Sequence, residues 1–71
     1  MMTFHSSDAG KALRTAMAIR SVNNLELAKV LGVNAEQVSR LRRQKDMKWS
    51  RVQMLVDHFD LTLEEFQRLG Q

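Results

Sequence analysis

The chain has 71 residues, of which 27% are charged, with no cysteine and a net charge of +3 at neutral pH. This length suits one small domain of modest stability, so we expect residues 1–71 to form a single domain. The lack of cysteine excludes a disulfide framework and a thiolate metal site, which fits a reducing cytoplasm. The first residues lack a basic region followed by an apolar run, so no signal peptide is expected, and no apolar stretch approaches the ~20 residues that span a membrane. A cytoplasmic protein without membrane attachment is therefore expected.

A first helix is predicted near the start of the chain. Residues 1–6 lack a helical pattern and are expected to be frayed. Ser6 or Ser7 can cap a helix that runs to about Arg20, although Gly10 weakens its first turn. Its apolar stripe at helical spacing consists of Ala9, Ala12, Leu13, Ala16 and Met17.

Residues 24–43 are the most informative segment, because they predict two short helices joined by a tight turn. The first is expected over about 24–31 and the second over about 35–43. Gly32 tolerates the positive φ that the turn requires, and the small Ala28 permits a close crossing of the helices. Two capping pairs begin the helices, Asn23 with Glu26 and Asn34 with Gln37. The apolar residues that close the small core between them are Leu27, Leu31, Val33, Val38 and Leu41.

The rest of the chain predicts a polar loop over 44–48 and two further helices. The fourth is expected over about 50–59. A fifth begins after Thr62, which forms a capping pair with Glu65, and ends near Gly70. No β alternation is present, so an all-α fold of five short helices around one core is predicted. The core face of the fourth helix consists of Val52, Leu55, Val56 and Phe59.

Positive charge is concentrated directly after the second of the paired helices. Between Arg40 and Arg51 there are six basic residues and one acidic residue, Asp46, whereas the other residues are net negative. A basic block beside a helix pair of this kind is typical of DNA binding. Alone, it is equally compatible with a solvated helix face.

The paired helices resemble the helix-turn-helix of lambdoid phage repressor and Cro proteins. The residues that carry this resemblance are Asn24, Leu27, Ala28, Leu31, Gly32, Val33, Val38 and Leu41. The similarity extends over nearly the whole chain after Ser7 and implies a lambda-repressor-like domain, closest to an all-helical phage Cro protein. The sequence departs from the family pattern at Asn24, where Gln is common, and at Gln44, where Gly is common; it also contains no proline.

The resemblance implies a sequence-specific repressor whose second paired helix lies in the major groove. Two copies would bind a pseudo-palindromic DNA operator, as a homodimer that is weak and forms mainly on DNA. The base-contacting residues carried over from the family are Ala35, Glu36, Ser39 and Arg40, with Gln37 as a further candidate. Arg40 is the strongest candidate for a base contact, because a guanidinium can donate two hydrogen bonds to guanine. Glu36 and Gln37 can instead serve only the helix N-terminus.

Other polar residues are expected to contact the DNA backbone, which sets affinity and register but not sequence preference. Trp49 has three interpretations in order of preference: core packing, a phosphate contact through its indole N–H, and a dimer contact. The apolar candidates for a dimer surface are Met47, Trp49, Met54 and Phe66. The predicted backbone-contacting residues are Asn24, Asn34, Arg43, Lys45, Lys48, Trp49, Ser50 and Arg51.

Competing functions are less well supported by the sequence. The same motif serves activators and toxin-neutralising repressors, and a helical protein-interaction module without DNA is also conceivable. The only histidines, His5 and His58, lack the partners that a metal site needs. No glycine-rich phosphate loop and no nucleophile–base pair is present, so we expect no enzymatic activity, no cofactor and no small-molecule ligand.

Overall fold

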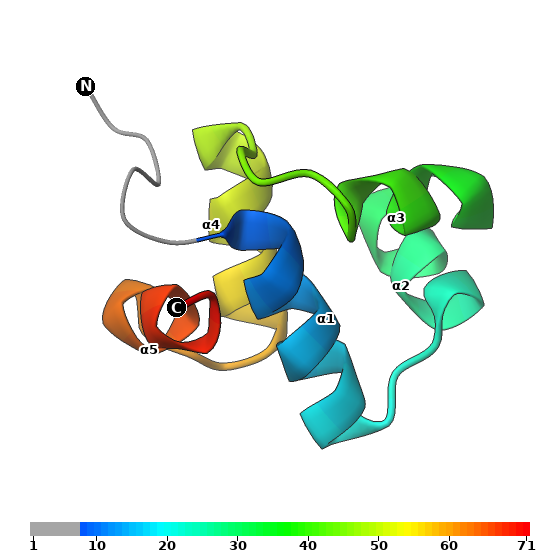
Figure 1. Cartoon of the computed structure of the whole chain (residues 1–71). Helices are drawn as coiled ribbons and strands as arrows, with labels where there is room; N and C mark the ends of the chain where they lie inside the picture. Colours follow the sequence, from blue (N-terminus) through cyan, green and yellow to red (C-terminus); the bar gives the residue numbers. More distant parts are fainter. Residues whose placement is uncertain (1–7) are drawn as a thin grey trace.

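The computed structural model describes residues 8–71, and these residues form five α-helices and no strand (Figure 1). This confirms the predicted all-α class. The expectation that residues 1–6 are frayed falls outside the described residues. The helices are α1 (Ala9–Arg20), α2 (Asn24–Leu31), α3 (Ala35–Leu41), α4 (Trp49–His58) and α5 (Leu63–Leu69).

The helix starts follow from local hydrogen bonds. The Asn23 side chain accepts a hydrogen bond from the Glu26 backbone N–H at 2.8 Å, and the Glu26 carboxylate accepts one from the Asn23 N–H at 3.0 Å. The pairs before α3 and α5 form the same reciprocal arrangement, so all three predicted capping boxes are confirmed. The cap of α1 differs from the prediction, because Asp8 accepts from the Lys11 N–H at 3.0 Å. Ser6 and Ser7 lie outside the described residues.

One apolar core joins the five helices. α1 packs against α5, and α2 packs against α3. Figure 1 shows α1 between the α2–α3 pair and α5. The predicted apolar residues are buried, except that Val33, Leu41 and Val56 are only partly buried. Phe66 was predicted as a possible surface residue, but it is fully buried, because α5 turns this side chain inward. The buried residues are Ala9, Ala12, Leu13, Ala16, Met17, Leu27, Ala28, Leu31, Val38, Val52, Leu55, Phe59 and Phe66.

The turn between α2 and α3 has the geometry that the sequence predicts. Gly32 ends α2 with φ of 72°, in the left-handed region that glycine adopts without steric cost. Its N–H and that of Val33 donate to the Ala28 carbonyl, which closes the turn. Ala28 itself is buried, as expected for a small residue at a helix crossing.

α3 ends two residues earlier than predicted. The N–H groups of Arg43 and Gln44 donate to the carbonyls of Arg40 and Leu41 at 3.0 and 3.2 Å, so the chain tightens into a turn after Leu41. The connection from Arg42 to Lys48 then leads to α4. We call these seven residues the basic loop.

The basic loop is fixed to the start of α1. The N–H groups of Ala9 and Gly10, which have no partner within their own helix, donate to the carbonyls of Lys45 and Gln44 at 2.8 Å each. Gly10 is buried in this contact. A Cβ at Gly10 would lie 2.8 Å from the Arg42 carbonyl oxygen and closer still to that of Gln44. The residue predicted only to weaken α1 therefore allows two backbone segments to approach each other.

Candidate nucleic-acid interface

The outward face of α3 carries the residues predicted to contact bases. Glu36, Gln37 and Arg40 are exposed, whereas Ala35 and Ser39 are partly buried. Arg40 Nη2 lies 3.5 Å from Glu36 Oε2, and both side chains are well exposed. Such a surface pair is weak, so the Arg40 guanidinium is free to exchange this partner for another acceptor. The five residues lie on one short helix.

Asn34 and Gln37 have a structural use at the start of α3. Asn34 Oδ1 accepts from the Gln37 N–H at 2.8 Å, and Gln37 Oε1 accepts from the Asn34 N–H at 3.1 Å. Gln37 thus takes part in the cap of α3, as one of its two interpretations expected. The cap uses only the carbonyl oxygen of the Gln37 side-chain amide, so the Nε2 donors remain available. The Asn34 side-chain oxygen is likewise committed to the helix.

Arg42 is a structural residue that the sequence did not single out. Its Nη1 donates to Asn24 Oδ1 at 2.8 Å, which joins the basic loop to the first turn of α2. Its own carbonyl accepts from Arg14 Nη1 of α1. Asn24, a predicted phosphate contact, therefore uses its amide oxygen to hold Arg42. The neighbouring Arg43 is exposed, and two adjacent arginines in a sequence give no indication of which one turns inward.

The predicted backbone-contacting residues that follow α3 lie on the basic loop and the first turn of α4. Lys45, Lys48 and Ser50 are exposed, like Arg43, while Arg51 is partly buried. The structure brings these side chains to the segment that directly follows α3. Trp49 retains 37% of its surface exposed and is not part of the core, so the preferred interpretation of core packing is wrong. α4 begins at Trp49 and directs it outward.

A hollow of about 200 Å³ lies between α3 and the start of α4. We call it the α3–α4 hollow. No carboxylate lines it. Its lining residues are Val33, Gln37, Arg40, Leu41, Gln44 and Arg51.

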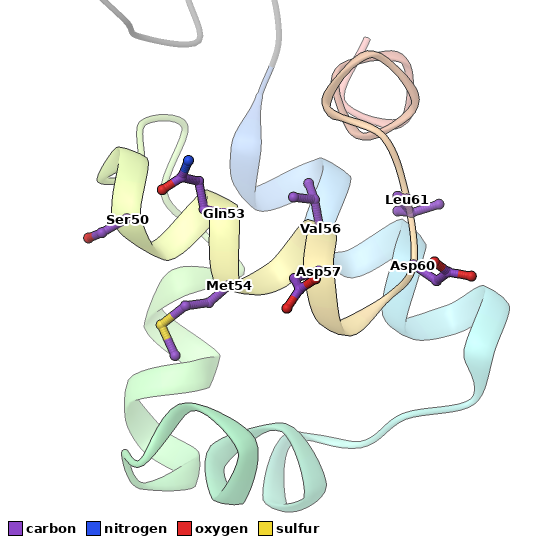
Figure 2. A pocket seen from close by; sticks show the side chains of 7 residues that line it. All are labelled: Ser50, Gln53, Met54, Val56, Asp57, Asp60 and Leu61. Atoms are coloured by element: carbon purple, nitrogen blue, oxygen red, sulfur yellow. The ribbon is translucent and has the colours of Figure 1, made fainter.

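A second hollow, of about 550 Å³, follows the outer side of α4 and its connection to α5. Figure 2 shows Ser50, Met54 and Asp57 on α4, and Asp60 on the connection. The two carboxylates give this groove a negative character, and no lysine or arginine lines it. Positive and negative charge are therefore separated between the two hollows, and the first is the one suited to nucleic acid.

Other kinds of site find no support in the described part of the chain. Residues 8–71 contain no group of three or more His, Cys, Asp or Glu side chains that could hold a metal ion. His58 lies edge-on to Phe59, with ring centroids 5.2 Å apart, and His5 lies outside the described residues. None of the described helices is both long enough and apolar enough to cross a membrane.

Comparison with known proteins agrees with this geometry. The family model of the Cro/C1-type HTH (helix-turn-helix) DNA-binding domain matches residues 12–69. Neither a curated protein nor a solved structure gave a significant match. The family match covers all five helices except the first turn of α1. The chain therefore belongs to the Cro/C1-type helix-turn-helix DNA-binding family.

Proposed function

We propose that this protein is a transcriptional repressor that binds a pseudo-palindromic operator as a dimer, with α3 of each copy in the major groove. The observation that carries the proposal is the exposed face of α3, which is capped at its N-terminus and followed by a basic loop tied to α1. A short, rigid helix with adjacent cations can enter a groove while the loop contacts the flanking phosphates. Bound protein would exclude polymerase from an overlapping promoter.

Specificity in this proposal depends chiefly on Arg40. Its exposed guanidinium can leave the 3.5 Å pair with Glu36 and donate two hydrogen bonds to a guanine, a discrimination of ~1–3 kcal/mol. Ser39 and Ala35 flank it and offer a hydroxyl and a methyl group to neighbouring base edges. Glu36 sits in the first turn of α3, where a carboxylate is stabilised by the helix dipole.

We further infer that the dimer is weak in free solution. The exposed apolar side chains on α4 are Trp49 and Met54, and Met54 lines the second hollow, the one that contains Asp57 and Asp60. Two side chains bury little apolar area in an interface, so operator binding would supply much of the association free energy. Sedimentation velocity at micromolar concentration should show monomers that become dimers on operator DNA. A tight dimer without DNA would contradict the weak-dimer proposal.

The test of the whole proposal is selection of bound sequences from random DNA duplexes. We expect a two-fold-symmetric site, bound with an affinity that falls steeply as salt rises. Placed across a reporter promoter, that site should lower expression when the protein is present. No enrichment would reject the operator-binding function, and raised expression would reject repression in favour of activation.

A matched pair of variants identifies the surface involved. Arg40→Ala removes a cation and an exposed i,i+4 ion pair on α3. Arg68→Ala removes the same kind of cation and the same kind of pair, with Glu64, on α5. We expect only Arg40→Ala to lose preference for the selected site. Equal losses in the two variants would mean that net charge, and not the α3 face, determines binding.

A further inference from the structure

The first turn of α1 lies between two segments that are distant from it in the chain (Figure 1). On one side is the basic loop, whose carbonyls accept from the N–H groups of Ala9 and Gly10. On the other side is the end of α5, where the Gly70 carbonyl accepts from the Asp8 N–H at 3.0 Å. We call residues 8–11 the bridge turn, because its consecutive backbone N–H groups join the basic loop to α5.

A glycine occupies each of these two contacts. A Cβ at Gly70 would lie 3.0 Å from the Asp8 nitrogen and 3.1 Å from the Asp8 carbonyl carbon, and closer still to the carbonyl oxygen. A Cβ at Gly10 would meet the carbonyl oxygens of Arg42 and Gln44. Gly70 is buried, and its φ of −92° is one that any residue adopts. Position 70 therefore requires glycine for the close contact and not for its backbone conformation.

The bridge turn is too short to absorb a displacement within itself. It is a single helical turn, closed by a hydrogen bond of 3.0 Å from the Ala12 N–H to the Asp8 carbonyl. Ala9 within it is fully buried, which leaves the turn no free space. The end of α5 cannot swing away instead, because Phe66 is fully buried one turn before Gly70. A displacement at Gly70 therefore reaches the basic loop.

We propose that Gly70 is a positioning residue for DNA binding, which acts through the bridge turn on the basic loop. The inference rests on the proposed function, in which the basic loop contacts phosphates beside the major groove. Gly70 ends α5, and α5 lies on the far side of α1 from α3 (Figure 1). Two backbone contacts in series thus determine where the cations of the loop stand when α3 enters the groove.

The first experiment compares Gly70→Ala with the matched control Thr62→Ala. The control removes the side-chain cap at the other end of the same helix, so it lowers stability without adding a group beside the bridge turn. Affinity for the selected operator is measured where circular dichroism shows both variants to be folded. Gly70→Ala should weaken binding about tenfold, the loss expected for one charge-assisted phosphate contact, and lower the salt slope by about 0.9. Thr62→Ala should leave both quantities at their wild-type values, and a Gly70→Ala variant that binds like the wild type would overturn the inference.

A combined variant tests whether the effect passes through the bridge turn. Gly10→Ala disturbs the contact on the other side of this turn. If both glycines act on the loop through one turn, the combined variant should bind DNA no more weakly than the weaker of the two single variants. Additive losses of affinity would mean that Gly70 acts by a separate route, and they would contradict the inference.

A measurement on the wild-type protein covers the case in which the variants do not fold. Hydrogen exchange of the backbone N–H groups of Asp8, Ala9 and Gly10 is followed by NMR at low urea concentrations. The three should become exchangeable in one opening event, with the same dependence on urea. Exchange of Asp8 at urea concentrations that leave Ala9 and Gly10 protected would show that the turn does not move as one unit, and would reject the inference.

Failure of this inference and failure of the proposed repressor function give different results. Backbone amide NMR signals of residues 42–48 report on the basic loop without DNA, and a duplex of arbitrary sequence reports on phosphate binding without an operator. If Gly70→Ala shifts these signals and weakens binding to that duplex in a protein that selects no sequence, the positioning role stands and the operator function is rejected. If an operator is found but Gly70→Ala leaves the loop signals unchanged, the positioning role is rejected and the operator function stands.

Discussion

Gly10→Ala is the substitution for which the structure makes the most distinctive prediction. A Cβ at this position would lie 2.8 Å from the Arg42 carbonyl oxygen and closer to that of Gln44, and both atoms belong to the backbone. Neither can rotate away as a flexible side chain would. The start of α1 must therefore separate from the basic loop. That separation stretches two hydrogen bonds, from Gly10 to Gln44 and from Ala9 to Lys45.

The expected magnitude follows from three effects. Forcing an extra methyl group into a packed contact costs ~1–3 kcal/mol, and each weakened hydrogen bond costs about 1 kcal/mol. The better helix propensity of alanine returns at most about 1 kcal/mol. We expect a net destabilisation of about 2–4 kcal/mol, measured as a lower urea midpoint by far-UV circular dichroism with an unchanged m-value. DNA affinity should fall as well, since the basic loop loses its anchor.

The control for helix propensity is Ala18→Gly, at an exposed position within the same helix. It should cost about 1 kcal/mol and leave DNA affinity unchanged. The two variants thus separate the close backbone approach from ordinary propensity. If Gly10→Ala raised the urea midpoint, as the same change does at an open helical site, the argument for a backbone contact at Gly10 would be refuted.

Three further substitutions test separate features of the fold. Phe66→Ala should cost ~3–5 kcal/mol because the ring is fully buried, so circular dichroism at 25 °C should show a largely unfolded chain; a native spectrum would argue against that burial. Asn34→Ala and Asn23→Ala should each cost about 1 kcal/mol through loss of a cap. Only Asn34→Ala, however, should weaken DNA binding by more than the stability loss explains. Equal losses of DNA affinity in the two variants would mean that the start of α3 has no special part in recognition. Trp49→Phe should change stability by no more than about 0.5 kcal/mol at this exposed position, and a loss above 2 kcal/mol in thermal unfolding would restore the core interpretation.

The sequence predicted those features of the fold that depend on neighbouring residues. A capping box is a contact between residues three apart, so Asn23 with Glu26 could be recognised without knowing the tertiary structure. The apolar stripes were predictable for the same reason, because helical periodicity assigns Leu13 or Leu27 to a buried face. The positive φ at Gly32 follows from its position after α2.

Features that depend on how helices meet were not predictable. Periodicity alone does not show that α5 packs on α1, and this packing decides that Phe66 is buried. The contact of Gly10 with Gln44 joins segments that are distant in the chain. At the candidate interface, the sequence named Arg51 as a phosphate contact, but the hollow that it shares with Gln37 requires the crossing of α3 and α4. The DNA contacts of the candidate interface remain predictions.

The separation of charge between the two hollows has a kinetic consequence. Arg40 and Arg51 line one hollow, and Asp57 and Asp60 line the other. This separation of charge contributes an electric dipole, which an external field can orient. A duplex is a line of negative charge, which attracts one side of the domain and repels the other before contact. Encounters would therefore begin with the domain already rotated towards its productive orientation. The association rate constant should fall as ionic strength rises, because screening over about 8–10 Å removes this pre-orientation.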